Sequence, residues 1–125
     1  MTRQNAADTY LESAIETAPP VKILRMLYEG AIRFLLKAKT FESASPEQVE
    51  WIRKSEDIIS ELRITLDHTV NPELAANLDG LYGFCLDELG DAVIKREPHH
   101  IDEAKEVLMT LLEAWKQVQI EGAGS

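Results

Sequence analysis

The segment from Ala18 to Phe34 carries apolar side chains around about half of the circumference of a helix. At 100° per residue these side chains fill one continuous arc. The remaining polar arc is narrow and consists of Lys22, Arg25, Glu29 and Arg33. Because a helix that packs on one neighbour needs an apolar stripe of only about 100°, this segment is predicted to contact several helices of a bundle or to offer an edge to a partner.

Proline and capping residues divide the chain into four helical segments. Ser45, Pro46 and Gln48 form a capping-box pattern, and Asn71 with Pro72 marks another helix start. The expected helices span about 20–41, 46–70, 72–96 and 98–120. Because the connections are short, the sequence predicts an all-α fold: an antiparallel up-down four-helix bundle over 18–120, with a short N-terminal arm or helix (1–17) and a flexible tail (121–125).

The apolar stripes of the last three helices predict the core. Their members are Ile52, Ile58, Ile59, Leu62 and Leu66; Leu74, Leu78, Leu81, Tyr82, Cys85, Leu89 and Val93; and Ile101, Ala104, Leu108, Leu111, Leu112, Trp115 and Val118. Five apolar residues lie off these stripes and are expected to be exposed: Val49, Ile64, Phe84, Ile94 and Met109. One exposed apolar side chain is ordinary, but several grouped on adjacent helices would form a docking patch.

Charge and cysteine content restrict the partners and the compartment. The 125 residues suit one domain, and the net charge of −9 disfavours nucleic acid and anionic membranes, so a partner is expected to be neutral, basic or apolar. The single cysteine, Cys85, excludes an internal disulfide and a CxxC metal site, and it lies on an apolar stripe. No stretch resembles a secretory signal or a membrane span, which favours a cytoplasmic protein without membrane insertion.

The sequence offers little for catalysis. Glu97 and His100 have a spacing used by di-iron bundles, but they straddle Pro98 at a helix boundary and have no second copy. There is no glycine-rich phosphate loop and no serine–histidine arrangement typical of hydrolases. We therefore expect no enzyme, no cofactor and no metal site; a ferritin-like metal bundle would require bound iron or manganese.

Five segments, in order along nearly the whole chain, resemble signatures of the FliS family of bacterial flagellin export chaperones. They are NAADTY with the following IETA and Pro20, LRMLYEGAIRF, SEDIISELRITLD, LDGLYGFCLDEL and VLMTLLEAWKQV. The resemblance implies an antiparallel helical bundle that binds the carboxy-terminal segment of flagellin, prevents premature polymerisation and assists delivery to the type III export gate. It also implies a monomer that binds its client 1:1, with an export-gate component and a co-chaperone as further partners.

Six residues are predicted to bind the partner. The resemblance assigns Tyr10 to an arm that covers part of the client surface when the client is absent, and we extend this role to Ile15. Val49, Ile64 and Phe84 are chosen because they lie off the apolar stripes of their helices. Ile58 is chosen because it lies at the edge of its stripe. The alternative to a chaperone is a helical interaction module, or a homodimer, that uses the same patch for another amphipathic partner.

Overall fold

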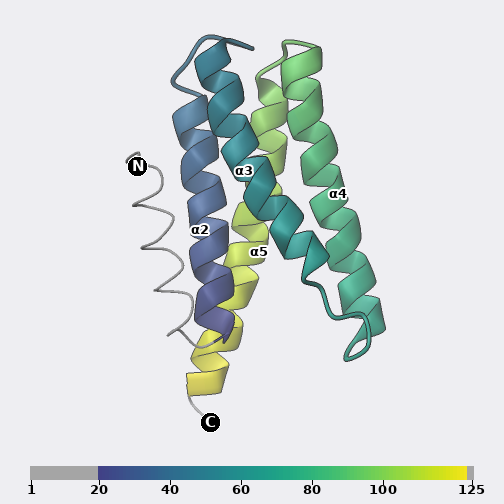
Figure 1. Cartoon of the computed structure of the whole chain (residues 1–125). Coiled ribbons are helices and arrows are strands. Elements are labelled where there is room, and N and C mark those ends of the chain that lie inside the picture. Colours follow the sequence, from purple (N-terminus) through teal and green to yellow (C-terminus); the bar gives the residue numbers. More distant parts are fainter. Residues whose placement is uncertain (1–19, 124–125) are drawn as a thin grey trace, which may run out of the picture.

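The computed structural model describes residues 20–123, which form four helices (Figure 1). These are α2 (Pro20–Ala38), α3 (Pro46–Ile64), α4 (Pro72–Ile94) and α5 (His99–Ala123). The predicted all-α class is therefore confirmed. The predicted arm, with Tyr10 and Ile15, lies outside the described residues.

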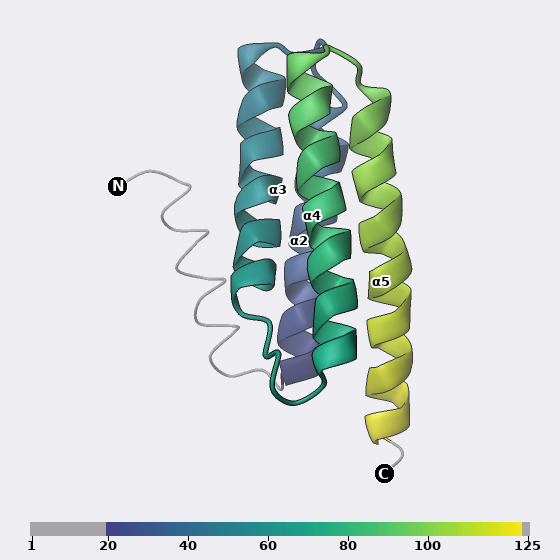
Figure 2. The same cartoon turned by 90° about the vertical axis from the view of Figure 1, so that its right-hand side faces the viewer.

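Each helix packs against the next one along the chain, and α2 also packs against α5. In Figure 2, α4 lies between α3 and α5, with α2 behind it. Short turns join consecutive helices, so neighbours run antiparallel. The structure confirms the predicted up-down bundle, and α2 contacts two helices, as its wide apolar arc predicts.

Local signals in the sequence set the helix starts. The Ser45 side chain accepts a hydrogen bond from the backbone N–H of Gln48, and the Asn71 side chain accepts one from the N–H of Leu74. A proline follows each of these caps, at 46 and at 72, where its missing N–H costs nothing.

Three helix ends come earlier than the sequence predicts, and the smallest difference is at α4, which ends at Ile94, two residues before its expected end. Helix α2 ends at Ala38, three residues before the expected end, and α3 ends at Ile64, six residues before it. Beyond α3, the Thr65 hydroxyl donates to backbone carbonyls of the last turn, and the Asp67 carboxylate accepts from the Thr69 N–H at 2.9 Å. These side-chain hydrogen bonds compete with continued helix. At the other end of the chain, α5 continues through Ala123, three residues past its expected end.

Two tyrosines meet in the middle of the core. Tyr28 of α2 and Tyr82 of α4 are fully buried, and their hydroxyl groups are hydrogen-bonded to each other. Burial raises the pKa of both hydroxyls, so both remain protonated at neutral pH. Because a buried hydroxyl needs a partner, the pair holds α2 and α4 in register across the bundle.

A buried glutamine closes the turn between α2 and α3. The Gln48 side-chain amide donates to the carbonyl oxygens of Ala38 (3.2 Å) and Phe41 (3.3 Å), and its oxygen accepts from the backbone N–H of Ala44 (2.8 Å). Ala44 has a positive φ of 57°, which is unusual for a residue other than glycine. One side chain thus satisfies three backbone groups of a strained turn.

Replacing Gly30 by alanine is expected to raise the free energy of unfolding by about 0.5–1 kcal/mol, because alanine has the higher helix propensity. Gly30 is buried at the contact of α2 with α3, and an added Cβ would lie 3.5 Å from Ile58 Cδ1, an ordinary van der Waals distance. Urea denaturation measures the change. Gly80→Ala, where the added Cβ meets nothing within 4 Å, is the matched control for propensity alone. A loss of stability for Gly30→Ala but not for Gly80→Ala would contradict the packing seen at Gly30.

Candidate functional site

Three residues predicted to lie in the core are exposed instead. Leu74 and Leu81 of α4 and Val118 of α5 have relative exposures of 45%, 37% and 45%. The ring of four helices buries the middle of each apolar stripe and leaves these edges uncovered by any other described residue. This corrects the predicted core, and it places an apolar surface along the contact of α4 with α5.

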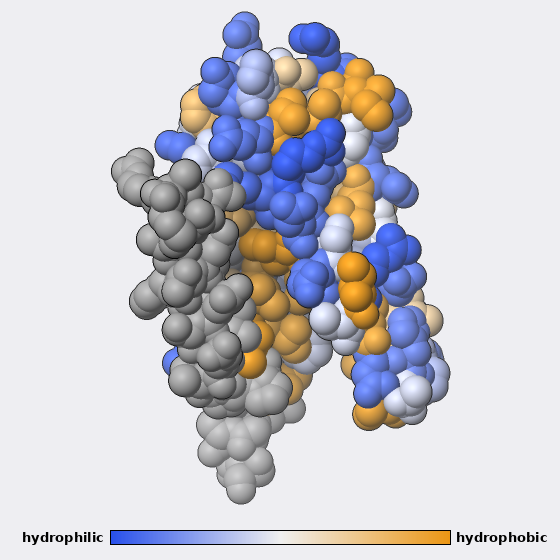
Figure 3. All heavy atoms as spheres, in the orientation of Figure 1, coloured by the Kyte–Doolittle hydropathy of each residue, from blue (hydrophilic) through white to orange (hydrophobic). Residues whose placement is uncertain are grey.

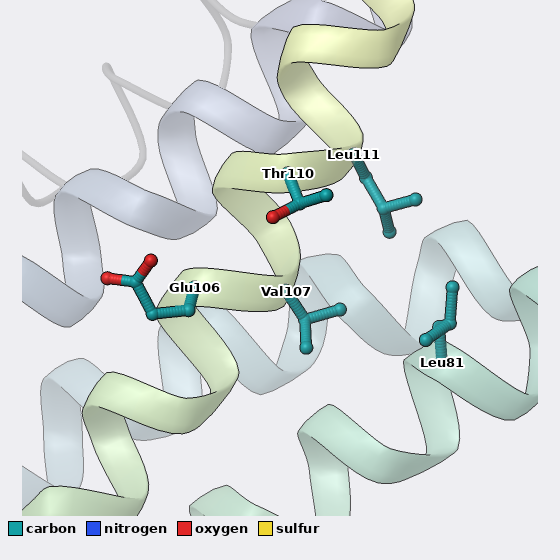
Figure 4. A pocket seen from close by; sticks show the side chains of 5 residues that line it. All are labelled: Leu81, Glu106, Val107, Thr110 and Leu111. Carbon is teal, nitrogen blue, oxygen red and sulfur yellow. The ribbon is translucent and has the colours of Figure 1, made fainter.

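The uncovered edges line three hollows. The first lies between α4 and α5, where the side chains of Leu81, Val107 and Leu111 point toward the space between the helices and the Glu106 carboxylate turns away (Figure 4). The full lining of this hollow is Leu81, Glu106, Val107, Thr110 and Leu111. The second is lined by Leu74, Leu78, Leu111, Ala114, Trp115 and Val118, and the third, at the turn between α3 and α4, by Leu66, Asp67, Val70, Asn71, Leu74, Ala75 and Leu78.

Shared residues join the hollows into one groove. Leu111 lines the first and second, and Leu74 and Leu78 line the second and third. We call the combined lining of these three hollows the α4–α5 groove. From Val107 to Val118 it runs along twelve residues of α5, or about 16 Å, which is the length of about three helical turns. The groove can therefore take an amphipathic helix or an extended apolar segment.

The lining of the groove is largely apolar. Among the described residues that line it, the charged side chains are those of Asp67 and Glu106. Cys85 lies beneath α4 in the core, and burial raises the pKa of its thiol to about 12, so it remains protonated. This agrees with its predicted role as a small buried apolar residue.

The structure separates the predicted partner-binding residues. Phe84 is 41% exposed and follows Leu81 by three residues, which places it on the α4 side of the groove. Ile64 is 76% exposed and lies two residues before Leu66 of the third hollow. Val49 was expected to be exposed, but it is half-buried on α3. At 100° per residue its side chain falls on the side of α3 that faces α4.

The remaining apolar residues that were singled out in the sequence differ in exposure. Ile94 and Met109 are exposed, as predicted. Ile58 is half-buried and faces Gly30 of α2, on the opposite side of α3 from α4.

On the face seen in Figure 3, hydrophilic side chains cover much of α3, and apolar side chains gather in the lower half, between α2 and α4.

Comparison with known proteins decides the family. Residues 3–122 match the family model described as flagellar protein FliS. The chain belongs to the FliS family. It is 33% identical to the flagellar secretion chaperone FliS of Vibrio cholerae over 113 residues, which cover 89% of this chain and 83% of the relative. Its identity to the Bacillus subtilis protein of the same name is 31%, covering 94% of this chain and 88% of the relative.

A third relative, the flagellar secretion chaperone FliS of Salmonella typhimurium, is 31% identical over 90% of this chain and 85% of its own length. Membership of the FliS family confirms the resemblance seen in the sequence and, with it, the predicted role in flagellar export as a chaperone. Within residues 20–123, no helix is both long enough and apolar enough to cross a bilayer.

The sequence held a signal for the groove that the stripes alone did not reveal. On α4, apolar residues from Leu86 around to Phe84 cover about 200° when placed at 100° per residue. An apolar arc of about this width on residues 18–34 was the reason to predict that this segment contacts more than one partner surface. By the same reasoning, residues at the edge of the α4 arc, such as Leu81, are expected to remain free for a partner.

A histidine ion pair joins α4 and α5 at one end of the bundle. His100 Nδ1 lies 2.5 Å from Glu88 Oε2, and His100 Nε2 lies 3.4 Å from Glu97 Oε1. Metal-ligand atoms of Glu88, Asp91 and His100 also lie within 4.8 Å of one another, although the absence of a metal site remains our expectation. The hydrogen bond that the protonated His100 ring donates to the Glu88 carboxylate raises the pKa of His100.

This ion pair predicts a pH dependence of stability. Because the pKa of His100 is higher in the folded state, the pair stabilises the fold below the unfolded-state pKa of about 6.5 and is lost as the pH rises through the folded-state pKa. We expect Glu88→Gln to lower the melting temperature at pH 6 more than at pH 9, as thermal denaturation followed by circular dichroism will show. Glu103→Gln, an exposed change on α5, is the control. An equal decrease at both pH values would contradict the assignment.

Proposed function

We propose that this member of the FliS family binds the carboxy-terminal segment of flagellin in the α4–α5 groove. By covering that segment in the cytoplasm, the chain prevents premature polymerisation and assists delivery of the subunit to the type III export gate. The single observation that supports the site is the continuous exposed apolar lining that includes Leu74, Leu81 and Val118. Such a surface on a small protein marks an interaction site.

Helix-in-groove binding explains why several hollows are needed. A segment that is disordered when free loses about 2–5 kcal/mol on ordering. At about 25 cal/mol per Å², burial of roughly 80–200 Å² of apolar surface offsets that cost before any net affinity appears. The three joined hollows of the α4–α5 groove present apolar contacts along about three helical turns, which is more apolar surface than any one of them offers alone.

The residues predicted from the sequence fit this site to different degrees. We propose that Phe84 contacts the client from the α4 side of the groove and that Ile64 extends the contact past the third hollow. Val49 and Ile58 of α3 remain predictions for a client that wraps further around the bundle. Tyr10 and Ile15 remain predicted parts of an arm that covers client surface when the client is absent.

Light scattering and calorimetry test the proposed function. We expect the chain to be a monomer alone and to form a 1:1 complex with the carboxy-terminal segment of its cognate flagellin. The heat-capacity change on binding should be negative, because apolar surface is buried. A stable homodimer that does not respond to the segment would contradict the proposal and favour the alternative of another amphipathic partner. An export-gate component and a co-chaperone are proposed as further partners of the complex.

A further inference from the structure

Charge is divided unevenly between the two halves of the bundle. Helices α4 and α5 together contain ten Asp or Glu residues and two lysines, whereas α2 and α3 contain six Asp or Glu residues and seven Lys or Arg residues. Helix α4 contains neither lysine nor arginine. The excess negative charge of the described helices is therefore concentrated on the two helices that form the α4–α5 groove.

Three carboxylates of α5 form a row beside the groove. Glu103, Glu106 and Glu113 fall within about 80° of one another at 100° per residue, and they extend over about 15 Å of the helix. We call these three residues the acidic row. The side chain of Glu106 is 68% exposed and that of Glu113 is 71% exposed. Glu106 lines the first hollow, and its carboxylate turns away from Leu81 in Figure 4, so Glu106 lies at the rim of the groove and not on its floor.

The lysines of α5 compensate this row only weakly. Lys105 Nζ lies 3.8 Å from Glu106 and 3.5 Å from Asp102, and Lys116 Nζ lies 3.5 Å from Glu113. At 100° per residue both lysines lie about 120–180° around α5 from Val107 and Leu111, farther from the groove than Glu103 and Glu106. No ion pair of Glu103 is found within the part of the chain that the structure describes. The rim therefore faces a bound segment with negative charge.

We propose that the α4–α5 groove selects a client helix whose apolar stripe is bordered by lysine or arginine on the side that faces α5. This inference rests on the proposed function. Glu106 lies about one helical turn after Glu103, and Glu113 lies about three turns after Glu103. This spacing favours client cations that are separated by about the same distances. A second copy of this chain is a poor occupant, because it would bring a net charge of −9 to a negative rim.

Charge reversal with a matched control tests the selection. The variant Glu103→Lys with Glu106→Lys changes the rim, and Glu50→Lys with Asp57→Lys makes the same change in net charge on the exposed face of α3. The probes are the cognate carboxy-terminal flagellin peptide and the same peptide with its Lys and Arg residues replaced by glutamine. Affinity and association rate are measured at about 0.05 M and about 0.5 M salt, where screening differs severalfold.

We expect the variant with Glu103→Lys and Glu106→Lys to bind the native peptide about tenfold more weakly at low salt, because two attractive pairs become repulsive. The α3 control should change affinity by less than about threefold, and the glutamine peptide should bind more weakly than the native one with little dependence on salt. Leu81→Asp separates this inference from the proposed function. If Leu81→Asp abolishes binding while the row variant binds like the wild type, the proposed function stands and the inference is overturned. If Leu81→Asp has no effect, the groove is not the client site and both fail.

Discussion

Replacing Leu74 and Leu81 together by aspartate is expected to weaken binding of the carboxy-terminal flagellin segment at least about a hundredfold without loss of helix. Burial of one leucine side chain contributes about 1.5–3 kcal/mol, and each tenfold change in affinity corresponds to about 1.4 kcal/mol. An aspartate in the same place would also have to lose its hydration against an apolar client. Because Leu74 is 45% exposed and Leu81 is 37% exposed, part of each side chain still packs on the bundle, so we expect some loss of stability while the helices remain folded.

A control on the same helix makes this result specific. Ile94 is 81% exposed on α4 but lines none of the three hollows of the α4–α5 groove. Ile94→Asp should leave affinity unchanged in calorimetric titrations, and circular dichroism should show equal helix content in all variants. Wild-type affinity in the Leu74 and Leu81 double variant, or an equal loss in Ile94→Asp, would show that the client binds elsewhere.

Replacing Gln48 by leucine is expected to lower the free energy of unfolding by about 3 kcal/mol. The leucine side chain would occupy a similar volume, but the carbonyl of Phe41 and the N–H of Ala44 would lose their partner, and the carbonyl of Ala38 would keep only its hydrogen bond from the backbone N–H of Phe41. An unsatisfied buried polar group costs about 1–3 kcal/mol. Gln48 is 1% exposed, so water reaches these groups poorly. Urea denaturation followed by circular dichroism gives the change.

Ser55→Ala provides the comparison for Gln48→Leu. The Ser55 hydroxyl is fully buried and makes one hydrogen bond, to the carbonyl of Ala31 at 3.1 Å. Its loss should cost about 1 kcal/mol, clearly less than the loss at Gln48. If Gln48→Leu were no more destabilising than Ser55→Ala, the three hydrogen bonds would not be what holds the turn between α2 and α3.

The fold could be predicted because its start signals are local. Ser45 with Pro46 and Asn71 with Pro72 act on the first turn of their own helix, and no distant contact is needed to recognise them. The end of α3 could not be located in the same way. Leu66 and Val70 continue the apolar period, but the hydrogen bonds around Asp67 form a turn there instead.

The groove was harder to predict because it depends on what each stripe packs against. Leu78 and Leu81 have the same apolar character and lie within about 60° of each other on α4, yet Leu78 is 6% exposed and Leu81 is 37% exposed. The difference arises from the position of α5, which periodicity does not contain. Helical periodicity did identify Phe84 and Ile64 as exposed, because they lie farther around their helices from the apolar stripe than Leu81 does. The resemblance indicated the client class but not the surface.

Methyl NMR spectroscopy of the chain, titrated with the cognate carboxy-terminal flagellin segment, tests the α4–α5 groove most directly. We expect the largest changes in chemical shift at methyl groups that line the groove, including those of Leu81, Val107 and Leu111. Groove methyl signals that stay unchanged at saturation, with changes confined to the contact of α2 with α3 near Ile58, would contradict this expectation.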